Sequence, residues 1–522
     1  MEFGMQVAKA LDVLRNEKKQ YKDYVPQEAI QAGNELVNAT KNIWDDVKKT
    51  VVELVYKEIP MQYPHVAVWW YSVLVDIEQD KELFYEFVKY IRKNRAAFSA
   101  NTQYFLFYQL KRKLFVSSDL DMKEIKEELW KYYKEVVEEF AQMIHTSLET
   151  IPEEERNENL VVVITEQFLA IQHGPTKTAL DRCRALQTVA GKNVMLLNTA
   201  EVMSSVGKIP FRDMCMAGYI PEKQKEQKQM WKGVAIPYYQ CENNMPDIEK
   251  LDELLEQIRR LAPMRVVSIG GSSMLSNLVN KMIPVLTVGL APSDLEYTTT
   301  KYQTISRKLQ SVDIEMLHNL GFSETNVIES IFTSSLKPQT EHITRRVLGI
   351  PEDKFFMVVI GGRLDLEITD EFLSNLEEIM KDDMHLGFIG TFNTYADYMQ
   401  KYPKLKTHSS YLGFCEDILS RLEVCDLYVN PTRKGGGTSC VEAMFMGIPV
   451  ISTRYGDVAV NAGEDFLVED YSQMKNVIMR YYIDKNYYNI MSKKAKQRAD
   501  VLLDTETEFM RVMSEVNKRE RN

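Results

Sequence analysis

The chain has 522 residues but no run of about 20 uncharged apolar residues, the length that a helix needs to cross a bilayer. Its first residues, MEFGMQVAKALDVLRNEKKQ, scatter charges through every apolar stretch and contain no small-residue cleavage site. They therefore do not resemble a secretory signal peptide. We predict a protein without a transmembrane segment that remains in the cytoplasm.

Cysteine is scarce, and its spacing includes no C-x-x-C pair and no nearby histidine that would complete a zinc cluster. The six cysteines are Cys183, Cys215, Cys241, Cys415, Cys425 and Cys440. Widely separated cysteines favour reduced thiols, so we predict no structural metal. Positive charge is also in deficit, since the net charge of the chain is −11. This deficit argues against a nucleic-acid partner.

The composition that remains is that of a globular protein, with 45% hydrophobic and 27% charged residues. At about 100–200 residues per domain, the length predicts about three domains. We divide the chain into a helical domain (1–156), a first α/β domain (157–336), a second α/β domain (337–485) and C-terminal helices (486–522). We expect these last helices to pack back across the cleft between the α/β domains.

Residues 1–156 contain little glycine and long stretches with helical periodicity. In MKEIKEELWKYYKEVVEEFAQM, the apolar residues Ile125, Leu129, Tyr133, Val136 and Phe140 recur at steps of three and four. This spacing predicts one buried face of a long helix. Similar aromatic stripes at 66–94 and 100–115 are more typical of a packed core than of a ligand surface.

Two alternations of apolar runs with helical segments follow. The first contains LVVVIT, NVMLLN, MRVVSIGG and IPVLTVGLA, and the second contains KFFMVVIGGR, LGFIG, DLYVNP and IPVIST. Strand, helix, strand order is typical of parallel sheets with helices on both faces. We therefore predict the fold class as α/β, with an all-helical domain ahead of two doubly wound domains.

The stretch CDLYVNPTRKGGGTSCVEAMFMGIPVIST places three glycines between a strand and a helix. Gly435, Gly436 and Gly437 can take positive φ and remove every Cβ from the loop. The helix is expected to begin at Thr438 or Ser439, so its free N–H groups and dipole would favour a phosphate. Neighbouring Arg433 and Lys434 would put cations beside this anion site.

A purely structural alternative exists for the same residues. Ser439 and Glu442 have the spacing of a capping box, and the glycines would then form only a tight turn. The segment IGGRLDLE favours the phosphate interpretation, because Arg363 follows a strand of the same domain and would reach the same sheet edge. Taken alone, Arg363 could equally be the partner in a surface ion pair.

These residues resemble the GT-B glycosyltransferases, over roughly residues 158 to 510. The resemblance is carried by GGR (361–363), by G-x-x-EDILSRL near 413–422 and by the glycine-rich stretch. It implies two facing Rossmann-like domains that bind a nucleotide-sugar in their cleft, chiefly through the second. It also implies that backbone near 414–416 reads the base and that Glu442 binds ribose hydroxyls. The implied diphosphate ligands are Arg363 and the amides of Gly435, Gly436, Gly437, Thr438 and Ser439.

The chain departs from this family's pattern at two positions. Many retaining members have two glutamates with seven residues between them, and Lys434 occupies the position of the first. They also have a lysine five residues after the arginine, where this chain has Ile368. We predict that Lys434 supplies the missing positive charge and is catalytic.

The segment HGPT (173–176) resembles the His-Pro-Thr segment of O-GlcNAc transferase and related protein glycosyltransferases. The resemblance implies that His173 faces the cleft and acts as a base or as a hydrogen-bond partner of the substrate. The alternative is a histidine that simply begins a helix. We interpret the D-L-D at 119–121 as a helix start away from the cleft, rather than as a metal site.

We predict a bacterial, metal-independent hexosyl- or HexNAc-transferase. It needs no cofactor beyond its co-substrate, a nucleotide-diphosphate sugar, and the favoured donor is a UDP-sugar. The favoured acceptor is a cytoplasmic protein such as a flagellin or adhesin, engaged by the helical domain. A cell-envelope glycan is the alternative acceptor. A third hypothesis, of another class, is a non-catalytic GT-B-shaped subunit of a glycosylation or secretion complex.

Overall fold

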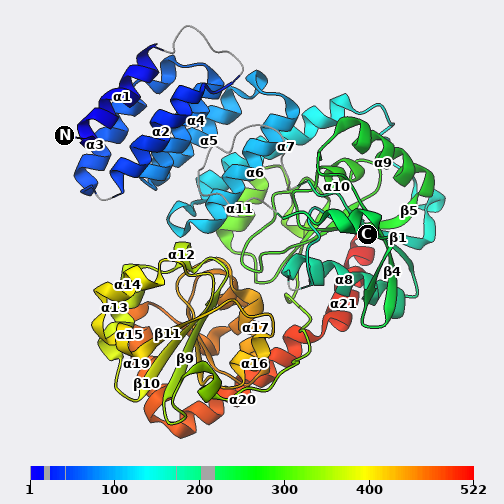
Figure 1. Cartoon of the computed structure of the whole chain (residues 1–522). Helices are drawn as coiled ribbons and strands as arrows, with labels where there is room; N and C mark the ends of the chain where they lie inside the picture. The colour runs from blue at the N-terminus through cyan, green and yellow to red at the C-terminus, as the bar shows by residue number, and fades with distance from the viewer. Residues whose placement is uncertain (1, 17–23, 42, 172, 202–217, 522) are drawn as a thin grey trace.

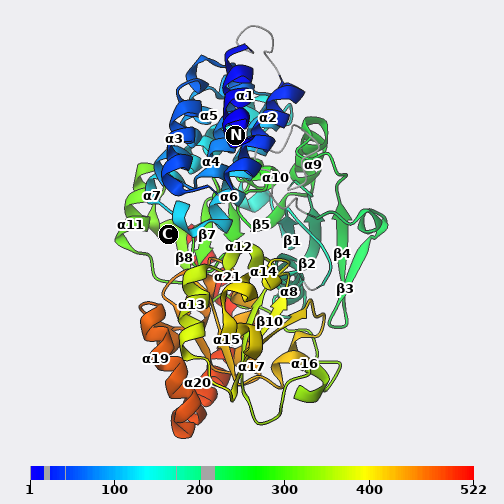
Figure 2. The same cartoon turned by 60° about the vertical axis from the view of Figure 1, so that its left-hand side comes forward.

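The computed structural model describes residues 2–16, 24–41, 43–171, 173–201 and 218–521, and Cys215 lies outside this part of the chain. A helical region, blue in Figure 1, lies against a first α/β domain, green, and both border a second α/β domain, yellow to orange (Figures 1 and 2). This is the predicted fold class. No helix in these ranges is long and apolar enough to cross a membrane.

The helical region forms a packed core, as its apolar periodicity predicts. Its helices are α1 (Glu2–Asn16), α2 (Gln27–Thr40), α3 (Asp45–Tyr56), α4 (Pro64–Ile77), α5 (Lys81–Lys93), α6 (Ala100–Val116) and α7 (Lys123–Met143). The predicted face of α7 is buried from Ile125 to Phe140. The core also includes Val162 and Ile164 of the first sheet, so the helical region is not an independent body but packs directly on the α/β domain.

The first α/β domain contains an eight-stranded sheet of order β3-β4-β2-β1-β5-β6-β7-β8 within the described ranges. Its strands are β1 (Asn157–Thr165), β2 (Asn193–Asn198), β3 (Lys228–Trp231), β4 (Val234–Gln240), β5 (Pro263–Ile269), β6 (Val285–Val288), β7 (Tyr302–Ile305) and β8 (Val327–Glu329). Only the β3–β4 pair is antiparallel among the strand pairs of the described chain. We did not predict β3, β4 or β7. The helices of this domain are α8 (Gly174–Thr188), α9 (Ile248–Leu261), α10 (Met274–Val279) and α11 (Ser311–Asn319).

The second α/β domain contains a six-stranded sheet of order β11-β10-β9-β12-β13-β14, again counted over the described residues. Its strands are β9 (Phe355–Gly361), β10 (Met384–Gly390), β11 (Ser409–Gly413), β12 (Leu427–Val429), β13 (Val450–Thr453) and β14 (Leu467–Val468). All of the pairs in this sheet are parallel. Its helices are α12 (Leu364–Glu367), α13 (Asp370–Ile379), α14 (Tyr395–Lys401), α15 (Pro403–His408), α16 (Ile418–Leu422), α17 (Gly437–Phe445), α18 (Gly456–Ala462) and α19 (Tyr471–Ile483).

Two C-terminal helices connect the α/β domains a second time. In α20 (Lys485–Leu503), Ala495 and Ala499 belong to the core of the second domain. In α21 (Thr505–Arg521), Phe509 and Val512 belong to the core of the first domain, where they pack with residues of α8. The chain therefore ends on the domain opposite to the one that it has just completed, as the red ribbon in Figure 1 shows.

Candidate active site

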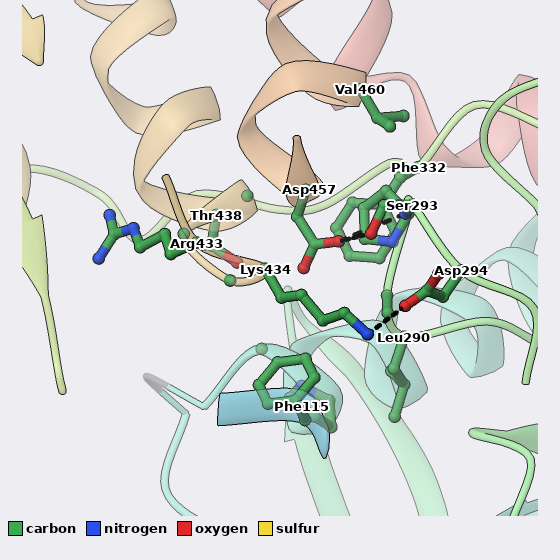
Figure 3. Close-up of a pocket in the computed structure, with 18 of the residues that line it drawn as sticks. Phe115, Leu290, Ser293, Asp294, Phe332, Arg433, Lys434, Thr438, Asp457 and Val460 are labelled. Carbon is green, nitrogen blue, oxygen red and sulfur yellow. Dashed lines mark hydrogen bonds and ion pairs between the residues drawn. The ribbon is translucent and has the colours of Figure 1, made fainter. Parts of the chain in front are cut away.

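A pocket of about 910 Å³ lies where the carboxyl ends of the two parallel sheets face each other. Its walls include Glu166 after β1, Leu290 after β6, Gly361 at the end of β9 and Arg454 after β13. Ligands of open α/β sheets bind at these carboxyl edges, so the pocket is where the strand alternation predicts a site. The helical region forms a third wall, which includes Phe115 at the end of α6 (Figure 3).

The glycine-rich loop gives room to two arginines. A Cβ on Gly435 would lie 2.7 Å from Nη2 of Arg363, and one on Gly436 would lie 2.7 Å from Nη2 of Arg433. Gly436 also has φ of 96°, a left-handed conformation that favours glycine, and it is the N-cap of α17. The loop therefore needs glycine for two reasons: the two guanidinium groups lie too close to where Cβ atoms would be, and the first amides of α17 stay exposed.

The capping-box alternative is wrong. No side chain caps α17, and Oγ of Ser439 instead donates to the carbonyl oxygen of Gly436 at 2.9 Å. Glu442 lines the pocket, where its Oε1 lies 3.9 Å from Nζ of Lys177 in α8. Burial raises the pKa of Glu442 to about 7, although Lys177 opposes this effect. Glu442 is thus directed toward the cleft rather than to its own helix end.

Arg363 lies in the pocket with part of its hydrogen-bonding capacity unused. Its Nη2 donates to Oε1 of Glu367 at 2.9 Å, and its guanidinium lies 5.1 Å from the centre of the Phe115 ring. Its Nε is buried and has no hydrogen-bond partner in the described part of the chain. An unsatisfied buried donor is costly, so this N–H is suited to an anionic ligand.

Arg433 lies against the glycine-rich loop and in the pocket wall, but its guanidinium is already paired with groups of its own domain. Its guanidinium points away from Lys434 (Figure 3) and is almost completely buried. It donates to Oε2 of Glu367 at 2.5 Å, to the carbonyl oxygen of Ile360 at 2.6 Å and to the Tyr428 hydroxyl at 2.8 Å. A buried guanidinium needs acceptors, and the Glu367 carboxylate and the Ile360 carbonyl supply them inside the domain. Arg433 thus connects the glycine-rich loop to the end of β9.

Lys434 crosses the cleft instead of following the loop. Its Nζ lies 2.9 Å from Oδ2 of Asp294 in the first α/β domain (Figure 3) and 3.2 Å from Oδ2 of Asp121 in the helical region. Lys126 pairs with both of these aspartates, at 2.5 Å to Asp121 and 3.0 Å to Asp294. We call Lys434, Asp294, Asp121 and Lys126 the ionic cluster; it joins all three regions of the chain.

The placement of the D-L-D segment was predicted wrongly. Asp121 lies in the pocket wall, and α7 begins after it without a side-chain cap. Its Oδ2 accepts a hydrogen bond from the Tyr455 hydroxyl at 2.8 Å. Its position follows from the way the helical region packs on the cleft, which the local sequence does not reveal. No group of three or more potential metal ligands occurs in the described ranges.

His173 lies in the pocket at the N-cap position of α8, but its side chain does not cap the helix. Its Nδ1 is 3.2 Å from Oγ1 of Thr176. Burial, and after it the charges of Arg112 and Lys177, lower the pKa of His173 to about 4. The imidazole is therefore neutral near neutral pH. A Cβ on the next residue, Gly174, would lie 3.6 Å from Oγ1 of Thr438, so the HGPT and GGGTS segments face each other.

Sequence reasoning missed several polar residues of the pocket. Glu166 is buried at the end of the LVVVIT strand, 3.8 Å from Nζ of Lys111, and burial raises its pKa. Asp457 accepts a hydrogen bond of 2.8 Å from the Ser293 hydroxyl (Figure 3), and burial raises its pKa to about 7. Glu166 directly follows a predicted strand, so its place at the carboxyl edge of the sheet could have been inferred. Nothing in the local sequence distinguishes Asp457.

Residues 414–416, which the resemblance places at the base of the nucleotide, also line the pocket.

Residues 356–484 match the family model described as Glycosyl transferases group 1. No curated protein matches the chain. A mutant of Thermobaculum terrenum O-GlcNAc transferase is 11% identical, with 100% of this chain and 98% of that chain covered and a TM-score of 0.56.

Two further solved structures are similar over 69% of this chain. A Rickettsia africae glycosyltransferase is 12% identical, with 98% of that chain covered and a TM-score of 0.49. Anabaena HepE in complex with UDP is 12% identical, with 99% covered and a TM-score of 0.48. Residues 356–484 thus match a glycosyl transferases group 1 model, and the chain has the GT-B fold, with a helical region ahead of its two α/β domains.

Proposed function

We propose that this chain transfers a hexose or an N-acetylhexosamine from a nucleoside-diphosphate sugar, first of all a UDP-sugar, to an acceptor. The observation that carries the proposal is the pairing of two anion-binding elements in one pocket. These are the free amides at the start of α17 and the buried, unpartnered Nε of Arg363. Both favour a diphosphate, and each is held in place by the fold before any ligand binds.

The diphosphate would lie between Arg363 and the amides of residues 435–439. Glycosyl transfer builds negative charge on the departing diphosphate, so donors that are already oriented stabilise the transition state. This arrangement supports a metal-independent transfer without a cofactor, which stays a prediction. Glu442, one turn further along α17, would accept hydrogen bonds from ribose hydroxyls.

His173 would act on the acceptor side of the same pocket. A neutral imidazole can accept the proton of an attacking hydroxyl or bond to the sugar. Arg112 and Lys177 contribute to the low pKa of this side chain, so an anionic donor that offsets their charge would raise it. Donor binding would thus prepare His173 as a better base.

Lys434 is our second catalytic candidate, although its ammonium is already paired in the structure. Its ammonium is held by Asp294 and Asp121. To reach a departing phosphate it has to leave these carboxylates, so we propose that Lys434 changes partner when the donor binds.

For the acceptor, we propose a protein of a bacterial cytoplasm, flagellin-like or adhesin-like. The likeness to an O-GlcNAc transferase, which extends over the whole chain, supports this choice at the level of the fold. A cell-envelope glycan is the second candidate, since the pocket wall contributed by the helical region would suit either acceptor.

The first experiment is thermal unfolding of the purified chain with UDP, GDP, ADP and CMP, and with their common sugar conjugates. A ligand at a hundredfold excess over its Kd stabilises the folded state by about 2.7 kcal/mol. We expect one nucleotide to stabilise the wild type and to lose this effect in Arg363→Ala and Glu442→Ala. Arg260→Ala, an exposed arginine of α9 outside the pocket, is the matched control. No stabilisation by any nucleotide in folded protein would favour a non-catalytic subunit.

A further inference from the structure

The helical region reaches the predicted phosphate site itself. The last turns of α6 bring Lys111, Arg112 and Phe115 into the pocket, beside Arg363 and the glycine-rich loop. In the view of Figure 3, Phe115 lies below the Lys434 side chain and the loop that carries Thr438. A domain expected to engage only the acceptor therefore forms part of the cavity that would hold the donor.

Arg112 is a cation without an anionic partner. Its Nε is buried and lacks a hydrogen bond, and no ion pair connects it to a carboxylate, within the residues that the structure describes. Its guanidinium lies 5.9 Å from the centre of the Phe115 ring, and that of Arg363 lies 5.1 Å from the same ring. Two guanidinium groups from different regions thus share one aromatic side chain, and both have a buried Nε with no acceptor.

The surrounding charges do not neutralise Arg112. Among the described residues, Lys177, buried on α8, has one carboxylate within 4.0 Å, that of Glu442 at 3.9 Å, and Lys111 has Glu166 at 3.8 Å. After burial, which has the largest effect, the charges of Arg112 and Lys177 lower the pKa of His173 further, so Arg112 lies close to this side chain. This part of the pocket wall therefore presents positive charge and, at Arg112, an N–H donor without a partner among the described residues, an arrangement that favours an anion with several acceptor oxygens.

We propose that Arg112 is a donor-binding residue, which binds the diphosphate of the nucleotide-sugar from the helical region and together with Arg363. The inference rests on the proposed function and deepens it. The planar guanidinium can bond two phosphate oxygens at once, and Phe115 holds the two arginines at a common position. The donor site is then complete only when the helical region is packed on the cleft.

The test is calorimetric titration of the full-length chain with UDP and with uridine, which lacks the phosphates. A charge-assisted hydrogen bond contributes about 1.5–3 kcal/mol. We therefore expect Arg112→Gln to raise the Kd for UDP about 10- to 100-fold. The Kd for uridine should not change. Arg260→Gln is the control for loss of one exposed arginine, and Arg112→Lys should recover part of the affinity.

The outcomes separate this inference from the proposed function. If the wild type binds UDP and Arg112→Gln binds it equally well, the inference is wrong while the proposed function stands. An equal loss for UDP and uridine would also overturn it, because the effect would not depend on phosphate. If neither UDP nor GDP nor ADP binds the wild type, the proposed function itself fails. Should Arg112→Gln not fold, Arg112→Lys decides, and an unchanged Kd for UDP would overturn the inference.

Discussion

Lys434 of the glycine-rich loop and Asp294 of the first α/β domain form an ion pair across the cleft, with Nζ 2.9 Å from Oδ2. Lys434 is almost completely buried, and the pair is completed by Asp121 and Lys126 of the helical region. Lys434, the residue at which the chain departs from the pattern that it resembles, is therefore also the point where all three regions of the chain meet.

Replacing Lys434 should destabilise the protein. In Lys434→Met, the two aspartates of the ionic cluster would share the single cation Lys126, and removal of one partner of a buried pair costs about 3–5 kcal/mol. Urea unfolding measures the change. The double variant Lys434→Met/Asp294→Asn should recover part of the loss, because neither charge is left alone. Strictly additive effects of the two substitutions would contradict the pairing.

The contribution of Asp457 to the stability of the protein should increase as the pH falls from about 8 to about 5. Burial raises the pKa of Asp457 to about 7, above the usual value of an aspartate in an unfolded chain. The folded state then binds a proton in this range before the unfolded state does, which stabilises it by roughly 2 kcal/mol. Asp457→Asn should flatten the dependence of the melting temperature on pH. Glu442, with its pKa also raised to about 7, acts in the same direction and provides a second variant, Glu442→Gln.

The glycine-rich loop offers a matched pair of substitutions. In Gly435→Ala, the new Cβ would meet Nη2 of Arg363 at 2.7 Å, whereas a Cβ on Gly362, also in the pocket wall, meets nothing within 4 Å. Displacing Arg363 should weaken nucleotide binding about tenfold, the effect of losing one charge-assisted hydrogen bond. Gly362→Ala should leave affinity unchanged. Equal affinities for the two variants would show that the position of Arg363 does not matter for binding.

His173→Asn should lower turnover far more than donor affinity. Loss of a positioned general base typically reduces the rate about 10²- to 10⁴-fold. Release of nucleoside diphosphate from the donor reports turnover, and calorimetry reports donor binding. Thr176→Val, which removes the hydroxyl 3.2 Å from Nδ1 of His173, should have a smaller effect on turnover. A parallel loss of donor affinity in His173→Asn would instead indicate a binding role.

Chelation of divalent cations should not change turnover, since the proposed transfer relies on fixed N–H donors and cations at the leaving phosphate. The measurement compares nucleotide release with excess EDTA and after re-addition of Mg²⁺ or Mn²⁺. Loss of activity in EDTA that either ion restores would refute metal independence.

Local patterns were sufficient to predict the strand-ends that carry the site. Continuous apolar runs mark buried parallel strands, and the residues that follow them come together at one sheet edge. This reasoning placed Arg363 and the three glycines at the cleft, whereas His173 was placed there by the resemblance of its HGPT segment. It missed β3, whose alternating KQMW has a single buried residue, and β7, a four-residue strand without a preceding predicted helix.

The partners of the charged side chains were decided by the tertiary structure. Arg433 and Lys434 are neighbours in sequence, yet one donates into the core of its own domain and the other pairs with two further regions. Arg112 enters the pocket because the helical region shares a core with the first sheet. Apolar periodicity predicts which face of a segment is buried, and glycine and proline predict where its backbone turns. A buried charge, in contrast, needs a partner whose attraction compensates the free energy lost on leaving water. The packing of the domains decides which partner is within reach.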